Sequence, residues 1–72
     1  MKKYYITWED SDLLVIGTIE EVNPKREAFF LYSIEVDGMI VPRNVLTSLG
    51  IDVERMEELA YEAHGDYEYN EE

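Results

Sequence analysis

One stretch decides the fold: SIEVDGMIV, at residues 33–41. The dipeptide Asp37-Gly38 at its centre is typical of a two-residue type I′ turn, because that turn needs a positive φ at both of its central positions. β-Branched residues lie on both sides of the dipeptide, as they do in strands. The stretch therefore predicts a tight β-hairpin in which Val36 faces Met39.

Working outward from this hairpin, the first 42 residues have the composition of strands. Residues 13–22 and 27–36 are rich in β-branched and aromatic side chains, and residues 23–26 (Asn-Pro-Lys-Arg) separate them. Residues 4–8 alternate in the same manner, and Pro42 marks a strand end because proline cannot donate to a ladder. The pattern predicts a four-stranded antiparallel meander.

The hydrophobic pattern also predicts a register. With a polar turn at residues 9–12, Ile6 faces Val15, and on the next ladder Val15 faces Ile34 and Ile19 faces Phe30. These residues then share one face of the sheet, and nearly all are apolar. A slip of one residue would move every side chain to the other face, so this agreement favours the register.

Two helical segments follow Pro42. Asn44 is a suitable cap for a short helical turn at residues 45–49, which Gly50 ends. Asp52 is a suitable N-cap for a longer helix that we expect to run to about His64, with Gly65 as its stop.

The longer helix carries an apolar stripe at helical spacing, formed by Val53, Met56, Leu59, Ala60 and Ala63. We expect this stripe to pack on the sheet face that carries Trp8, Phe30 and Tyr32. The sequence thus predicts an α+β fold: a four-stranded antiparallel meander, a short helical turn and one C-terminal helix packed on one face. Residues 1–65 form a single domain in this interpretation, and residues 66–72 form an acidic, flexible tail.

The second face of the predicted sheet is too apolar for a face left in water. It carries Tyr5, Leu14, Ile16, Phe29, Leu31 and Ile40. A single helix cannot cover both faces, and a wet face would alternate cleanly to polar residues. Three explanations are open: the sheet curls towards a small barrel, the chain forms a homodimer through this face or an edge, or the patch is a partner site.

Charge excludes several classes of partner. Seventeen acidic side chains stand against six basic ones, giving a formal net charge of -11. This charge repels the phosphates of nucleic acids and of anionic lipids, so we expect neither direct nucleic-acid binding nor membrane binding. The chain begins without an apolar signal segment and has no apolar run of ~20 residues, which predicts a cytoplasmic protein.

Catalytic signals are weak, and we expect no enzyme, no cofactor and no metal site. The chain has no cysteine and one histidine, His64, which is expected at the helix C-terminus, where its charge would offset the helix dipole. No serine has a base near it in sequence, and no glycine-rich phosphate loop occurs. Residues 9–12 are acidic but lack the ligand alternation of a calcium loop, so a polar turn is the favoured interpretation.

The acidic array of the C-terminal helix and tail is the main functional signal. We expect a basic partner protein to contact Glu54, Glu57, Glu58, Glu62, Asp66, Tyr67 and Tyr69. Carboxylates arranged in this way can occupy the nucleic-acid groove of a nuclease, repressor or other nucleic-acid-binding protein. The leading hypothesis is a non-enzymatic inhibitor and DNA mimic, of the kind that phages and mobile elements use against host defence.

Two other interpretations of the same residues are open. In one, the protein is a homo-oligomeric accessory or structural protein that assembles through its apolar sheet face, and its acidity serves solubility. In the other, the acidic helix face is only a solvated surface.

Overall fold

The structure is a computed structural model that describes residues 1–24 and 26–70, with side chains described through residue 65. Its elements follow one another as β1 (Lys2–Trp8), β2 (Ser11–Asn23), β3 (Arg26–Val36), β4 (Met39–Pro42), α1 (Arg43–Ser48) and α2 (Val53–Asn70). This confirms the predicted α+β class and the order of its elements.

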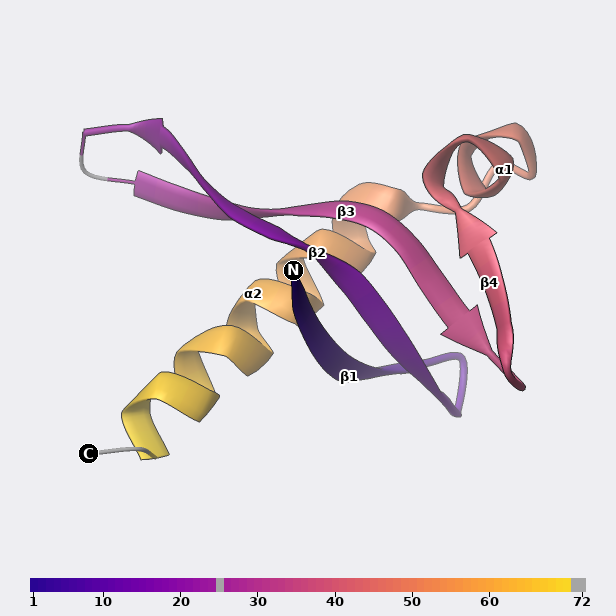
Figure 1. Cartoon of the computed structure of the whole chain (residues 1–72), viewed down its shortest axis with the longest axis horizontal. Coiled ribbons are helices and arrows are strands. Elements are labelled where there is room, and N and C mark those ends of the chain that lie inside the picture. Colours follow the sequence, from indigo (N-terminus) through magenta and orange to yellow (C-terminus); the bar gives the residue numbers. More distant parts are fainter. Residues whose placement is uncertain (25, 71–72) are drawn as a thin grey trace.

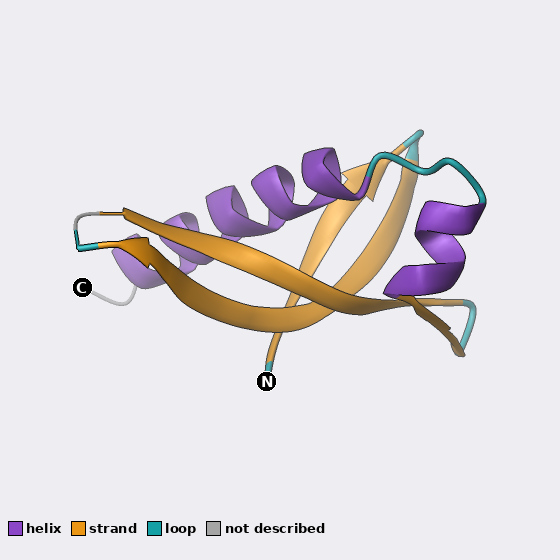
Figure 2. Ribbon diagram, turned by 90° about the horizontal axis from the view of Figure 1, so that it is seen from above, coloured by secondary structure: helices purple, strands orange, loops and turns teal. Residues whose placement is uncertain are grey.

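The four strands form one antiparallel sheet in the order β1-β2-β3-β4 (Figure 1). The sheet is open, with β1 and β4 as its two edges, so it does not close into a barrel. Helix α2 crosses one face of the sheet, whereas none of the described helices lies on the opposite face (Figure 2). The molecule therefore has two layers, and its core lies between the sheet and α2.

Two-residue turns close the first and third hairpins. Asp37 and Gly38 have φ values of 51° and 78°, and Val36 pairs with Met39, which confirms the predicted hairpin. Glu9 and Asp10 also have positive φ values, 48° and 65°, and Trp8 pairs with Ser11. Both turns have the signs that a type I′ turn requires.

The tight turn at Glu9 and Asp10 corrects the predicted register of the first ladder. A four-residue turn was expected, with Ile6 facing Val15, but Ile6 pairs with Leu13 and Tyr4 pairs with Val15. The predicted pairing of β1 with β2 is therefore displaced by two residues. Since side chains alternate with a period of two, the predicted faces of β1 and β2 are unaffected.

A β-bulge changes the second ladder. Val15 pairs with Ile34 as predicted, but the register then shifts between Ile16 and Gly17, and Tyr32 is the residue skipped on β3. Beyond the bulge Ile19 pairs with Phe29, not with Phe30 as predicted. An extra residue on one strand reverses the alternation that follows it.

This reversal places Phe29 and Leu31 under the helix, at 3 % and 0 % exposure, so their predicted position on the outer sheet face is wrong. Phe30 and Tyr32, which were expected under the helix, lie on the outer face instead, and Tyr32 is exposed. The outer face therefore loses two of its expected apolar residues and gains two aromatic ones.

Gly17 lets β2 and β3 approach at the bulge. A Cβ atom at this position would collide with the carbonyl oxygen of Phe30 and would lie 2.9 Å from the ring of Phe29. The Phe29 ring therefore packs directly against the glycine backbone, in space that any larger residue would fill.

The core joins the inward residues of the sheet to the predicted stripe of α2. Its buried members are Ile6, Leu13, Val15, Phe29, Leu31, Ile34, Leu46, Val53, Met56 and Ala60. Trp8 packs against this cluster, as expected, and so does Leu59. Burial of each large apolar side chain contributes about 1.5–3 kcal/mol.

Helix α1 differs from the prediction at its start and agrees with it at its end. Pro42 is the N-cap and forms no side-chain cap bond, so the prediction that Asn44 caps this helix is wrong. At the other end the amides of Gly50 and Ile51 donate to the carbonyls of Thr47 and Leu46. With Gly50 at a φ of 76°, this is a Schellman motif, which turns the chain towards α2.

Helix α2 starts as predicted and ends later. The Asp52 carboxylate accepts a 3.1 Å hydrogen bond from the amide of Arg55, which confirms the predicted N-cap. The helix then continues through Gly65 to Asn70, so the predicted stop at Gly65 is wrong. Gly65 is not among the glycines with a positive φ, and a glycine in a helical conformation lowers stability by only about 1 kcal/mol relative to alanine.

Candidate functional site

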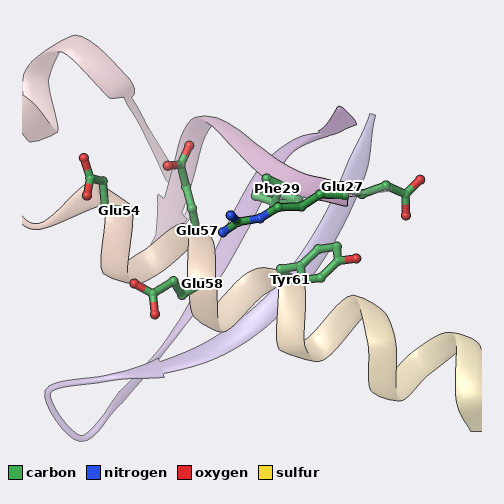
Figure 3. Close-up of a pocket in the computed structure, with 8 residues that line it drawn as sticks. Glu27, Phe29, Glu54, Glu57, Glu58 and Tyr61 are labelled. Carbon is green, nitrogen blue, oxygen red and sulfur yellow. The ribbon is translucent and has the colours of Figure 1, made fainter. Parts of the chain in front are cut away.

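A groove lies between the β3 edge and α2, and we call it the β3–α2 groove. It encloses about 410 Å³ and is lined by Arg26, Glu27, Ala28, Phe29, Glu54, Glu57, Glu58 and Tyr61. Figure 3 shows Glu54, Glu57, Glu58 and Tyr61 on the helix, with Glu27 and Phe29 on the strand. A second hollow of about 390 Å³ shares Arg26, Glu27 and Tyr61 with it and continues to Glu21 and Pro24.

The helix side of the groove follows from spacing. Glu54, Glu57, Glu58 and Tyr61 stand at positions i, i+3, i+4 and i+7, which lie on one face of an α-helix. Val53, Met56 and Ala60 hold the adjoining side of the helix in the core, so this acidic face lies on the flank of α2, next to the sheet edge. The amphipathic pattern of α2 thus places the carboxylates along the groove.

Glu57 is held in place by the strand that it faces. Its Oε2 atom accepts a 2.8 Å hydrogen bond from the amide of Leu31 and a 2.7 Å bond from the Arg43 guanidinium. Arg43 also donates to the carbonyl of Leu31 at 2.9 Å, and its guanidinium carbon lies 4.5 Å from the ring centroid of Phe30. The two side chains together satisfy both main-chain groups of Leu31, as a neighbouring strand would.

The groove has a strong negative balance. Four carboxylates and one guanidinium, that of Arg26, line it. Arg43 neutralises Glu57 from beyond the groove, and Arg55 lies 3.4 Å from Glu58 in an exposed pair. Exposed pairs of this kind contribute little stability, about 0–1 kcal/mol, and leave Glu58 available to solvent.

The expected partner-binding residues divide into three groups. Glu54, Glu57 and Glu58 line the groove, whereas Glu62 is exposed on α2 outside its lining. The side chains of the other expected contacts lie outside the described residues, so their role stays a prediction: Asp66, Tyr67 and Tyr69.

Sequence reasoning missed the strand side of the groove and Tyr61. The helical spacing of Tyr61 from Glu57 and Glu58 was a usable signal, because residues four and three apart are neighbours on a helix. No local signal places Glu27 opposite α2, since that contact depends on the bulge and on the tertiary packing of the helix.

The outer sheet face is the other expected interface. Tyr5, Leu14, Glu35 and Ile40 pair in one row that crosses all four strands. Tyr5 and Ile40 are 71 % and 57 % exposed, whereas Ile16 is buried within the described chain. Phe29 and Leu31 lie on the other side of the sheet, so the expected patch is smaller than predicted and has the exposed Tyr32 at its side.

The single histidine is buried, in a different setting from the one expected. His64 lies six residues before the last residue of α2, not at its C-terminus, and the Tyr4 hydroxyl lies 2.5 Å from its Nδ1 atom. Its ring also packs against that of Tyr61, with centroids 5.9 Å apart. The contact with Tyr4 ties α2 to the edge strand β1, so capping of the helix dipole is not its role.

Neither a metal cluster nor a membrane-spanning helix occurs in the part of the chain that is described. No three His, Asp or Glu side chains there are grouped so that they could hold a metal ion. No helix there combines the length and the apolar character needed to cross a bilayer. Comparisons of the chain with protein-family models, curated proteins and solved structures found no match.

Proposed function

We propose that this protein is a non-enzymatic, acidic binding module that docks on a basic, nucleic-acid-binding protein and occupies the site that nucleic acid would fill. One observation carries the proposal: the carboxylates of Glu27, Glu54, Glu57 and Glu58 converge on one groove in a chain of net charge -11. Self-repulsion of this size opposes folding, and it aids steering towards a positively charged partner.

The proposed mechanism is electrostatic substitution. Duplex DNA presents one charge per roughly 1.7 Å of its axis, and a positively charged cleft binds it mainly through those charges. A helix face with carboxylates at successive turns, such as Glu54, Glu58 and Glu62, offers the same cleft a rigid negative ridge. An inhibitor of a nuclease or repressor, from a phage or a mobile element, is the class of protein that uses this device.

Charge reversal tests the proposal. The variant with Glu54→Lys and Glu58→Lys alters exposed positions and leaves the Glu57–Arg43 pair intact. Its matched control is Asp12→Lys with Glu20→Lys, which makes the same change in net charge on exposed residues of β2. Tagged wild type and both variants are used to capture proteins from a lysate of the source cells, with elution by a salt gradient.

We expect wild type and control to retain a basic nucleic-acid-binding protein that elutes at moderate salt and is displaced by duplex DNA. The groove variant should lose at least nine-tenths of this capture. Equal capture by both variants, or capture that salt and DNA leave unchanged, contradicts the proposal, because exposed charge pairs are screened by salt.

A second candidate function is assembly of identical chains through the outer sheet face, with the acidity serving solubility. The exposed row that contains Tyr5 and Ile40 supports it. Under this proposal the variant Tyr5→Glu with Ile40→Glu is a folded monomer in sedimentation experiments, while wild type sediments as a dimer. A wild type that sediments as a monomer at high concentration contradicts it. Leu31 cannot serve in this test, since it is a core residue.

A further inference from the structure

The edge of β3 is only partly covered. Strand β4 pairs with residues 33–36 of β3 and ends at Pro42. From Leu31 back to Arg26, no described strand pairs with β3 on the side opposite β2. An exposed strand edge presents main-chain donors and acceptors that can pair with another chain.

The direction of the main-chain groups at this edge follows from two observations. The amide and carbonyl of Leu31 bond to Glu57 and Arg43, so they point away from β2. The carbonyl of Phe30 points the other way, because it lies where a Cβ of Gly17 on β2 would be. Since these directions alternate along a strand, the main-chain groups of Phe29 and Glu27 point to the open edge.

The open edge forms one wall of the β3–α2 groove. Phe29 lines the groove and is almost fully buried, so it lies at the floor. Among the described residues, no side chain bonds to the amide or carbonyl of Phe29, in contrast to the two that bond to those of Leu31. Buried main-chain groups in folded proteins almost always have partners, so this position favours an added one.

We propose that an extended, basic segment of a partner protein docks in this groove and adds a strand to the free edge of β3, from Glu27 to the Arg43–Glu57 pair. The inference rests on the proposed function and names the form of the partner's contact. Strand addition uses main-chain hydrogen bonds for affinity and side-chain contacts for specificity. Five residues of β3 offer about 16 Å of edge at roughly 3.3 Å per residue.

Charge selects the occupant. Lysine or arginine side chains on the added strand would meet Glu54 and Glu58 on one side, and the ring of Tyr61 offers them a cation–π contact. A second copy of this chain is a poor occupant, because it would bring two acidic grooves together. The Arg43–Glu57 pair already occupies the main-chain groups of Leu31, so it sets one end of the docked strand.

A matched pair of variants tests the main-chain contact. Glu27→Pro removes the outward amide, whereas Glu27→Gln removes the same carboxylate and keeps that amide. Proline is tolerated at a strand edge where no ladder bond is lost. The probe is a blocked heptapeptide of alternating lysine and valine, titrated into the full chain at low salt and followed by the amide NMR signals of the protein.

We expect Glu27→Gln to bind the peptide up to about threefold more weakly than wild type, because the groove loses one carboxylate, and Glu27→Pro to bind it at least tenfold more weakly than Glu27→Gln. In wild type, binding should slow hydrogen exchange of the Phe29 amide at least tenfold. This second measurement decides the matter if Glu27→Pro does not fold.

Each of the following results overturns the inference: no binding of the peptide, equal binding by the two Glu27 variants, or an exchange rate of the Phe29 amide that the peptide leaves unchanged. Binding that depends on Glu54 and Glu58 but not on the Glu27 amide rejects strand addition and leaves the acidic docking surface standing. A Phe29 amide protected in a dimer without peptide shows that a second copy holds the edge, and this also rejects the proposed occupant.

Discussion

At the scale of single residues, the contact between Glu57, Arg43 and the main chain of Leu31 is the most consequential one outside the core. The side chain of Glu57 is only 17 % exposed, and it accepts hydrogen bonds from two donors at once. A predicted partner-binding residue and a structural residue are thus the same side chain. This is why Glu57 is a poor choice for testing binding and a good one for testing stability.

We predict that Glu57→Leu lowers the free energy of unfolding by about 1–3 kcal/mol, because it leaves the Leu31 amide without its acceptor. Arg43→Met should cost less, since the Leu31 amide keeps its Glu57 acceptor. In a double-mutant cycle measured by urea unfolding, the two substitutions should be coupled by about 1 kcal/mol or more. Additive effects would mean that the Arg43 and Glu57 side chains do not stabilise each other.

Prediction from the sequence succeeded at residues whose partners are local. Asp52 caps α2 through an amide three residues away, and Asp37-Gly38 turns the chain within two residues. It failed for Glu57, whose partners are 14 and 26 residues away along the chain. The charge of Glu57 and its position on the helix indicated a solvated side chain. Its place at the β3 edge depends on how α2 packs on the sheet, which the sequence does not show.

At the scale of elements, the strands and helices were predictable and the bulge was not. Residues 28–32 read Ala-Phe-Phe-Leu-Tyr, which is apolar at both odd and even positions. In a run that is apolar at every position, the alternation of apolar and polar residues does not show which side chains point inward. A change of register within the run therefore leaves no sign in the sequence. The bulge at Tyr32 then decides that Phe29 and Leu31 are core residues, and with them the position of the groove.

Because α2 continues past Gly65, it gives a prediction for a substitution at that residue. Gly65 lies within the helix, and a Cβ there meets no atom within 4 Å. We expect Gly65→Ala to raise the free energy of unfolding by about 0.5–1 kcal/mol, the usual difference between alanine and glycine in a helix. Urea unfolding followed by circular dichroism measures this change.

Gly17→Ala is the matched contrast for that measurement. The same added methyl group would collide there with the Phe30 carbonyl, so we expect it to destabilise by about 1–3 kcal/mol, as overpacked cores do. A destabilising Gly65→Ala would show that residue 65 is not helical in solution.

At the scale of the whole molecule, the charge predicts how stability responds to salt. A net charge of -11 on 72 residues repels itself more in the compact state than in the expanded unfolded chain. The Debye length falls from about 30 Å at 0.01 M salt to about 10 Å at 0.1 M, so this repulsion is screened over that range.

We therefore expect the midpoint of thermal unfolding to rise as sodium chloride increases from about 0.01 M to 0.1 M, a range set by the change in screening. Differential scanning calorimetry at fixed pH measures it. Replacing three exposed residues, Glu9, Asp12 and Glu21, by glutamine should reduce the dependence. A midpoint that falls with salt would show that attractive pairs such as Arg43–Glu57 outweigh the net repulsion.

The extra residue, Tyr32, shifts the inward–outward alternation of β3 by one position, as a frameshift displaces the codons of a gene. Before it, odd-numbered residues of β3 face the helix, as Phe29 and Leu31 do; after it, even-numbered residues do, as Ile34 and Val36 do. A ladder that took Tyr32 in as an ordinary paired residue, with no bulge, would keep every amino acid yet exchange the inner and outer surfaces of the whole arm from Arg26 to Leu31. The hydrophobic content of the chain would be unchanged, while its core and its acidic groove would both be lost.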